Sequence, residues 1–141
     1  MNKYILLTAL LAPFAAHSAG NELAELKNKN LVLSTNADTC VLIGRTAFVE
    51  ARTAARPIAT SEAEVCVVEG KDAAKTAHAE MKSAFKKKAQ TELTEWRLEW
   101  MATFDAAVPK VGDSESTYVS RVKAARSNVD RATNKIEIAL E

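Results

Sequence analysis

The chain has 141 residues, of which 48% are hydrophobic and 26% charged, a balance typical of a folded domain and too apolar for a disordered chain. Its formal net charge of +1 provides no strong field to attract nucleic acid or anionic lipid, so neither is expected as a partner on charge alone. Gly and Pro are scarce, with four and three residues, which favours helices over a sheet with many turns.

The first segment, residues 1–19, has the pattern of an export signal. Lys3 supplies a positive charge, an apolar run extends from Tyr4 to Ala16, and the segment Ala16-His17-Ser18-Ala19 offers small residues for cleavage. The run is too short to cross a bilayer. We therefore predict a cleaved signal peptide and a periplasmic or secreted mature protein of about 120 residues, which suits one domain.

Residues 20–36 combine two short patterns. The stretch Glu22–Lys27 is compatible with a short helix, and the apolar triplet Leu31–Leu33 follows between Asn and Ser residues. We predict a loosely docked N-terminal arm here, in front of a single helical domain at residues 37–141.

The first long helix is predicted to begin at Asp38 or Thr39, because either side chain can accept a hydrogen bond from the amide groups of a first helical turn. It should end near Ala55, since Pro57 disfavours a helical conformation at Arg56. Its small or apolar positions recur at helical spacing and are Cys40, Ile43, Ala47, Ala51 and Ala54.

A second helix is predicted from a capping box at Ser61–Glu64, in which the serine hydroxyl and the Glu64 carboxylate each satisfy a backbone amide. Gly70 leaves two alternatives: the helix ends there and Asp72 caps a new one, or the helix continues through the glycine. We expect a kink or a break.

The clearest periodicity in the chain lies between Asp72 and Val108. Apolar residues follow steps of three and four from Ala74 to Ala107, which predicts one long helix with an apolar side. Pro109 and Gly112 then end it.

The last helix is predicted at Ser114–Leu140, capped by Ser114 or by Asp113. Folded back on the helix at Asp72–Val108, it places small or β-branched residues opposite large ones, for example Val122 opposite Trp100. The predicted fold class is therefore all-α: a three- or four-helix bundle dominated by a long C-terminal antiparallel helical hairpin.

Cys40 and Cys66 are the only cysteines, and an even pair in an exported chain predicts a disulfide. The Cys-x-x-Cys spacing of redox-active pairs is absent. If the first two helices turned at Pro57, however, the two cysteines would lie about 15 Å apart along the axis, too far for a bond. Either the first helix is shorter or bent, or the connection runs back along it, or the disulfide joins two chains.

Two groups of residues are candidates for partner binding. Paired aromatic residues on a helix are common anchors at interfaces, although the same pair can pack in the hairpin core. The basic cluster that contains Lys86 and Lys87 is either a solvated face or a contact for an acidic protein or lipid surface. The first group, with its polar rim, is Trp96, Arg97, Trp100 and Met101.

No metal, cofactor or catalytic site is predicted. His78 is the only histidine outside the predicted signal peptide, so it cannot build a zinc site with the distant cysteines, and no haem-attachment sequence exists. We interpret it as an edge histidine, half buried. Glu92, Glu95 and Glu99 form a charged row that is typical of a solvated helix face, and no catalytic motif is present.

These observations predict an exported, non-enzymatic protein–protein interaction module of a bacterial envelope or secretome: an adaptor, inhibitor, assembly factor or chaperone-like binder. Its partner would be another envelope or secreted protein, or a second copy of the chain. Two alternatives remain. One is a membrane-surface-active protein with Trp96 and Trp100 at a lipid interface, and the other is a cofactor-binding helical bundle.

Overall fold

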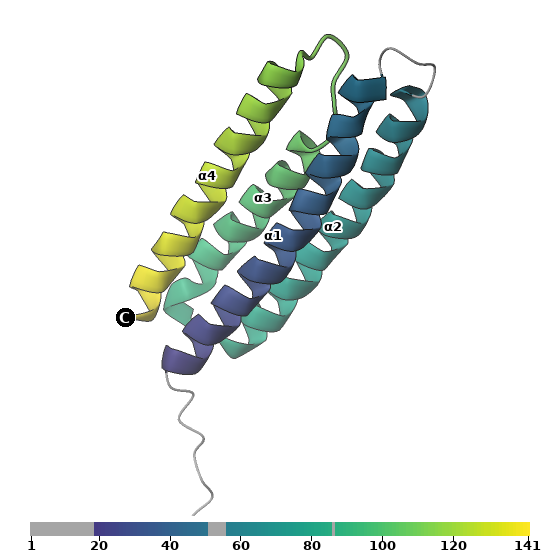
Figure 1. Cartoon of the computed structure of the whole chain (residues 1–141). Coiled ribbons are helices and arrows are strands. Elements are labelled where there is room, and N and C mark those ends of the chain that lie inside the picture. Colours follow the sequence, from purple (N-terminus) through teal and green to yellow (C-terminus); the bar gives the residue numbers. More distant parts are fainter. Residues whose placement is uncertain (1–18, 51–55, 86) are drawn as a thin grey trace, which may run out of the picture.

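The computed structural model describes residues 19–50, 56–85 and 87–141, which form four long helices that run alternately up and down the bundle (Figure 1). These residues contain no strand, so the all-α prediction is confirmed. The elements are α1 (Ala19–Val49), α2 (Arg56–Ala84), the short 3-10 helix η2 (Lys87–Ala89), α3 (Gln90–Ala106) and α4 (Glu115–Leu140).

The helices surround one core. Contacts are most extensive between α1 and α2 and between α3 and α4, and α2 also packs closely on α3, whereas α1 and α4 touch least among neighbours. A column of aromatic rings fills the centre, with centroids 6.3 Å apart between Trp96 and Trp100 and 6.1 Å apart between Trp100 and Phe104. Each fully buried large apolar side chain contributes roughly 1.5–3 kcal/mol to folding.

Helix α1 begins at Ala19 and not near Asp38, so residues 20–36 are its first half and not a loosely docked arm. Leu26 and Leu33 are buried in the core, as are Ala37 and Cys40 farther along the same side. The helical pattern was hard to see because polar residues occupy inward positions: Glu22 is buried, and Asn30 is half buried.

The connection between α1 and α2 explains the disulfide. It lies between Val49 and Arg56, so Pro57 falls in the first turn of α2, where a missing N–H leaves no helical hydrogen bond unmade. Cys40 therefore lies about as far before the connection as Cys66 lies after it. Their Cα atoms are 5.5 Å apart and the sulfurs are bonded, which confirms a disulfide within one chain. The predicted helix end near Ala55 lies outside the described residues.

Helix α2 runs through both predicted interruptions. It already includes Ser61, so no capping box starts a helix there, and it continues through Gly70 without a break. A Cβ atom at Gly70 would lie 2.2 Å from Phe104 Cε1. The glycine is therefore required for the close approach of an aromatic ring, and not for a turn of the backbone.

The long helix predicted at Asp72–Val108 is divided between α2 and α3. Helix α2 ends at Ala84, and the Gln90 side chain donates hydrogen bonds to the carbonyl oxygens of Lys82 (3.1 Å) and Phe85 (3.0 Å). No Gly or Pro occurs at this break, so tertiary packing overrides the local helical preference. Helix α3 does pack on α4, but the hairpin of the predicted length does not form.

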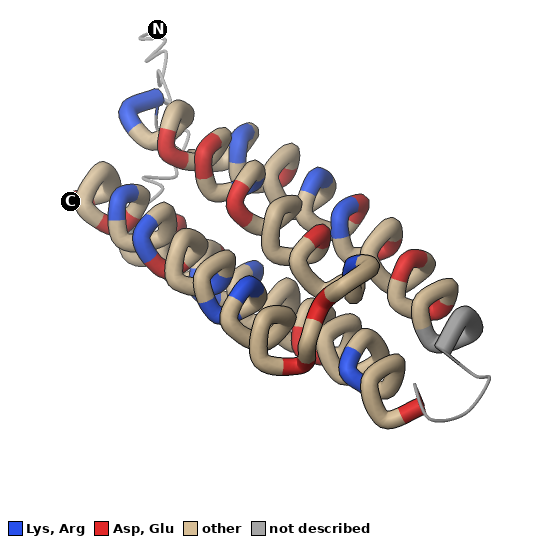
Figure 2. The backbone as a smooth tube through the Cα atoms, turned by 90° about the horizontal axis from the view of Figure 1, so that it is seen from above, with Lys and Arg blue, Asp and Glu red and all other residues tan. Residues whose placement is uncertain are grey.

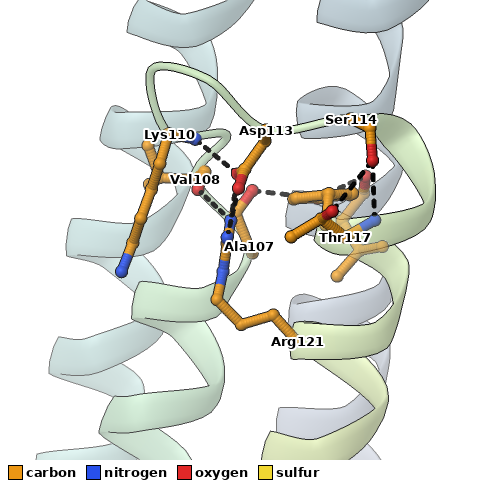
Figure 3. A network of polar contacts seen from close by, with 9 residues as sticks. Ala107, Val108, Lys110, Asp113, Ser114, Thr117 and Arg121 are labelled. Atoms are coloured by element: carbon orange, nitrogen blue, oxygen red, sulfur yellow. Dashed lines mark hydrogen bonds and ion pairs between the residues drawn. The ribbon is translucent and has the colours of Figure 1, made fainter.

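The turn between α3 and α4 is fastened by a network around Asp113 (Figure 3). Arg121 donates two hydrogen bonds to this carboxylate, at 2.8 and 2.7 Å, and the Lys110 amide donates a third at 2.8 Å. These hydrogen bonds, chiefly those from Arg121, lower the pKa of Asp113 to about 2. Ser114 caps α4, as predicted, by accepting a hydrogen bond from the Thr117 amide (3.1 Å).

Tyr118 joins this turn to α1. Its hydroxyl lies 2.9 Å from the Ala107 carbonyl oxygen and 3.1 Å from that of Val41, so one proton is shared between two acceptors. Burial raises the pKa of Tyr118 to about 12. Gly44 makes the approach possible, because a Cβ atom there would lie 2.5 Å from the hydroxyl oxygen.

Candidate partner-binding surfaces

The two tryptophans lie in the core and not on the surface. Trp96 is 0% exposed and Trp100 is 1% exposed. Both indole N–H groups donate to the same Asn30 Oδ1, at 2.8 and 3.1 Å, and Asn30 Nδ2 donates to Thr133 Oγ1 at 3.1 Å. Their polar atoms are satisfied inside the protein, so neither ring is free to anchor a partner.

The other predicted binding residues differ from the tryptophans in being at least partly exposed to solvent. Arg97 and Met101 are partly exposed, one turn apart on α3, and Lys87 is exposed on η2. Lys86 lies outside the described residues. The structure therefore leaves Arg97, Met101 and Lys87 at the surface and removes the aromatic anchors from it.

Arg97 lies opposite His78 in the register of α2 against α3, which is set by the Lys71–Asp105 ion pair and by the approach of Gly70 to Phe104. His78 is 8% exposed, more buried than the half-buried position expected from the sequence, and its Nε2 atom has no hydrogen-bond partner among the described residues. Burial lowers the pKa of His78 below 6.5, and the positive charges of Arg97 and Lys82 lower it further. The imidazole is therefore uncharged at neutral pH.

Arg97 differs from the other arginines whose side chains are described. Arg45, Arg121 and Arg126 each form an ion pair, and Arg131 donates a hydrogen bond to Asn128. Arg97 has no ion pair or hydrogen bond within the described ranges, and its Nε atom is buried without an acceptor.

The outward side of α1 carries a row of exposed aliphatic residues. Leu31 and Leu42 are each 67% exposed and Val49 is 77% exposed. Their separations of eleven and seven residues correspond to about three and about two helical turns, which places them on one side of α1.

This side of α1 is also poor in charge. Asp38, seven residues after Leu31 and so on the same side, is the only charged residue between Lys29 and Arg45, and its carboxylate pairs with Arg126. The exposed Thr35 and Thr39 donate their hydroxyl protons to carbonyl oxygens of their own helix, each at 3.0 Å, and so offer less polarity to solvent. We call Leu31, Thr35, Thr39, Leu42 and Val49 the outer face of α1.

Glu69 of α2 borders this outer face at Thr39. Glu69 lines a hollow of about 180 Å³ together with Thr39 and both cysteines. Glu62 lies two turns earlier on the same side of α2, and neither carboxylate has an ion pair among the residues placed by the structure. Val65, exposed between them, extends the apolar surface.

A second hollow, of about 280 Å³, lies between α1 and α4 over Trp100. The Arg126 guanidinium covers the indole at 5.3 Å from its centroid, donates to the Ser34 hydroxyl and carbonyl oxygens at 3.0 Å each, and pairs with Asp38. These polar groups form hydrogen bonds and an ion pair with one another. They hold α1 against α4, and they do not form an acid–base pair for catalysis.

The remaining acidic residues and cysteines form neither a catalytic pair nor a metal site among the described residues. Glu95 pairs with Lys135 (2.6 Å) on the surface, and in the described ranges no three His, Cys, Asp or Glu side chains are grouped as metal ligands would be. Lys and Arg residues are interleaved with Asp and Glu along the helices (Figure 2). Within the part of the chain that the structure places, no helix has the length and apolarity of a membrane span.

Sequence reasoning missed the outer face of α1 and the Asn30 cluster, because both lie in the segment that was predicted to be a loose arm or the start of the domain. The signal that would have found the outer face is the almost charge-free stretch at residues 30–44. No protein-family model matches this chain, and no curated protein or solved structure matches it either.

Proposed function

We propose that the protein is an exported, non-enzymatic binding module that recognises another protein through the outer face of α1. The observation that carries the proposal is the row of exposed aliphatic side chains on a bundle whose core is already filled. Aligned apolar exposure of this kind marks interaction surfaces in soluble proteins. The fold does not require these side chains, so a partner is the natural use for them.

Charge indicates the kind of partner. Glu69 borders the outer face at Thr39, Glu62 lies two turns earlier on the same side of α2, and neither has an ion pair among the described residues. A helix that carries an apolar ridge with Lys or Arg beside it would bury Leu31 and Leu42 and pair with the two carboxylates. The proposed partner is therefore a protein with a basic amphipathic helix.

Export is supported by two features. Residues 1–19 have the signal-peptide pattern, and α1 begins at Ala19, so cleavage after Ala19 leaves the helix complete apart from its first residue. The Cys40–Cys66 bond is of the kind that persists in oxidising compartments. Intact mass of the exported protein should correspond to residues 20–141 less two hydrogen atoms.

The membrane-surface alternative loses the residues on which it was based, because both indole rings are in the core. Anionic vesicles should therefore leave the tryptophan emission of the folded protein unchanged.

Site-specific photocrosslinking in the producing cell tests the proposed surface. A photoreactive residue at Leu42 should give a discrete adduct with a second protein, and Leu31→Glu should reduce its yield strongly. A photoreactive residue at Ser127, exposed on α4, is the matched control and should give no such adduct. Equal adducts at both positions would overturn the proposal, and an adduct of twice the chain's mass would assign the face to a second copy instead.

A further inference from the structure

We propose that His78, Lys82 and Arg97 form a binding site for a doubly charged oxyanion of the phosphate class. The site lies between α2 and α3, away from the outer face of α1, and it stands even if that face binds nothing.

The geometry brings three nitrogen-bearing side chains together from two helices. His78 and Lys82 are four residues apart on α2, so they lie one above the other on the same side of the helix. Gly70 of α2 lies against Phe104 of α3 and Lys71 pairs with Asp105, so the register of these antiparallel helices places Arg97 opposite His78. Lys71 of α2 pairs with Asp105 of α3 farther along the same interface, which fixes the alignment of the two helices.

Among the described residues, no carboxylate forms an ion pair with this cluster. Asp72 and Asp105, on the adjoining surfaces of α2 and α3, are paired with Lys75 and Lys71. Lys82 and Arg97 form no ion pair within the described ranges. Two permanent cations thus stand beside a mostly buried imidazole.

Unmade hydrogen bonds point to the same ligand. Among the described residues, Arg97 Nε and His78 Nε2 are both buried without a hydrogen-bond partner, and the arginine nitrogen is always a donor. A buried donor without an acceptor is unfavourable, and an oxygen-rich anion supplies acceptors. The guanidinium fork matches two oxygens of such an anion, and the lysine adds a point charge.

The choice of a doubly charged anion follows from the number of donors. A single carboxylate would neutralise only one of the two permanent cations. A phosphate dianion neutralises both, and one of its remaining oxygens can accept a hydrogen bond from an imidazole N–H group. Phosphate binding should therefore favour the protonated form of His78, against burial and the two cations, which disfavour it.

Proton NMR of the imidazole tests the site directly. The full chain has two histidines, His17 and His78, and the His78 resonance is identified by its loss in His78→Asn. Inorganic phosphate and glycerol phosphate should both raise the pKa of His78 relative to chloride at the same ionic strength. If only glycerol phosphate does so, the site takes phosphomonoesters and not free phosphate. Acetate should leave this pKa unchanged.

Variants separate a site from a general salt effect. Arg97→Gln should abolish the difference between phosphate and chloride and weaken phosphate binding about tenfold or more, the loss expected for a charged hydrogen-bonded pair. Lys82→Gln should weaken it to a smaller extent, and the exposed Arg131→Gln should have no effect. Circular dichroism verifies that each variant is folded. An equal response to phosphate in Arg97→Gln and in Arg131→Gln, or none in the unaltered chain, would overturn the proposal.

Discussion

Asn30 is the residue that lets two tryptophans occupy one core. Its amide oxygen accepts hydrogen bonds from both indole N–H groups, and its amide nitrogen donates one to Thr133. Residues of α1, α3 and α4 are therefore joined through one side chain. A buried indole N–H without an acceptor is destabilising. The polar residue that obscured the helical pattern of α1 is thus a requirement of the core.

Replacing Asn30 by Leu should therefore destabilise the protein by at least about 2 kcal/mol, because two indole donors lose their acceptor. Urea unfolding of purified protein measures the change. Thr133→Val is the matched control, since it removes only the hydrogen bond to the Asn30 amide nitrogen, and it should lower stability by about 1 kcal/mol or less. Equal losses in the two variants would contradict this role.

Gly70 gives a second prediction for a single residue: replacing it by alanine should lower stability, although helix propensity alone would raise it. Alanine is favoured over glycine in an exposed helix interior by about 1 kcal/mol. Here the added Cβ meets the Phe104 ring, so Gly70→Ala should instead destabilise by roughly 1–3 kcal/mol through overpacking. In a Phe104→Leu background the penalty should shrink or reverse, and a thermodynamic cycle of the four proteins measures this coupling.

Among the elements, α4 was predicted best, because its signals are local. Ser114 caps it, its end near Leu140 is as predicted, and Tyr118, Val129 and Ile136 on its inward side are buried. The start of α1 and the end of α2 were not predictable in this way. Phe85 and Ala89 turn the chain without Gly or Pro, and only their burial against other helices favours the turn over a continuous helix.

The α3–α4 turn gives a prediction that depends on pH. The folded-state pKa of Asp113 is about 2, below the ordinary value of 3.8, so its ionised form stabilises the fold above pH 3.8. That contribution is lost as the pH falls from 3.8 to about 2. Asp113→Asn should therefore reduce the free energy of unfolding near neutral pH, and the difference from the unaltered protein should narrow on acidification.

Urea unfolding at several pH values measures this difference. Asp130→Asn, on the exposed side of α4, is the control and should show a difference that changes little over the same range. A difference for Asp113→Asn that stays constant between pH 5 and pH 2 would contradict the assigned network.

For the whole molecule, the disulfide joins α1 to α2 and the Asp113 network joins α3 to α4, while Asn30, Tyr118 and Arg126 connect the two pairs.

The Cys40–Cys66 disulfide restricts the unfolded chain by closing a loop between residues 26 apart in sequence. Its removal in the double variant Cys40→Ala/Cys66→Ala should lower stability by about 3 kcal/mol and leave the helix content intact. The unaltered protein with its disulfide reduced should show the same loss of stability as the double variant. Unchanged stability in the double variant and in the reduced protein would contradict this role.

The outer face of α1 can serve a partner only if the fold does not depend on its side chains, so the most direct measurement is the unfolding free energy of the double variant Leu31→Ser/Leu42→Ser. Both side chains are mainly exposed, and the predicted result is a change within about 0.5 kcal/mol, as for ordinary surface substitutions. A loss of about 2 kcal/mol or more would show that these residues belong to the core, and the outer face of α1 would then no longer be available to a partner.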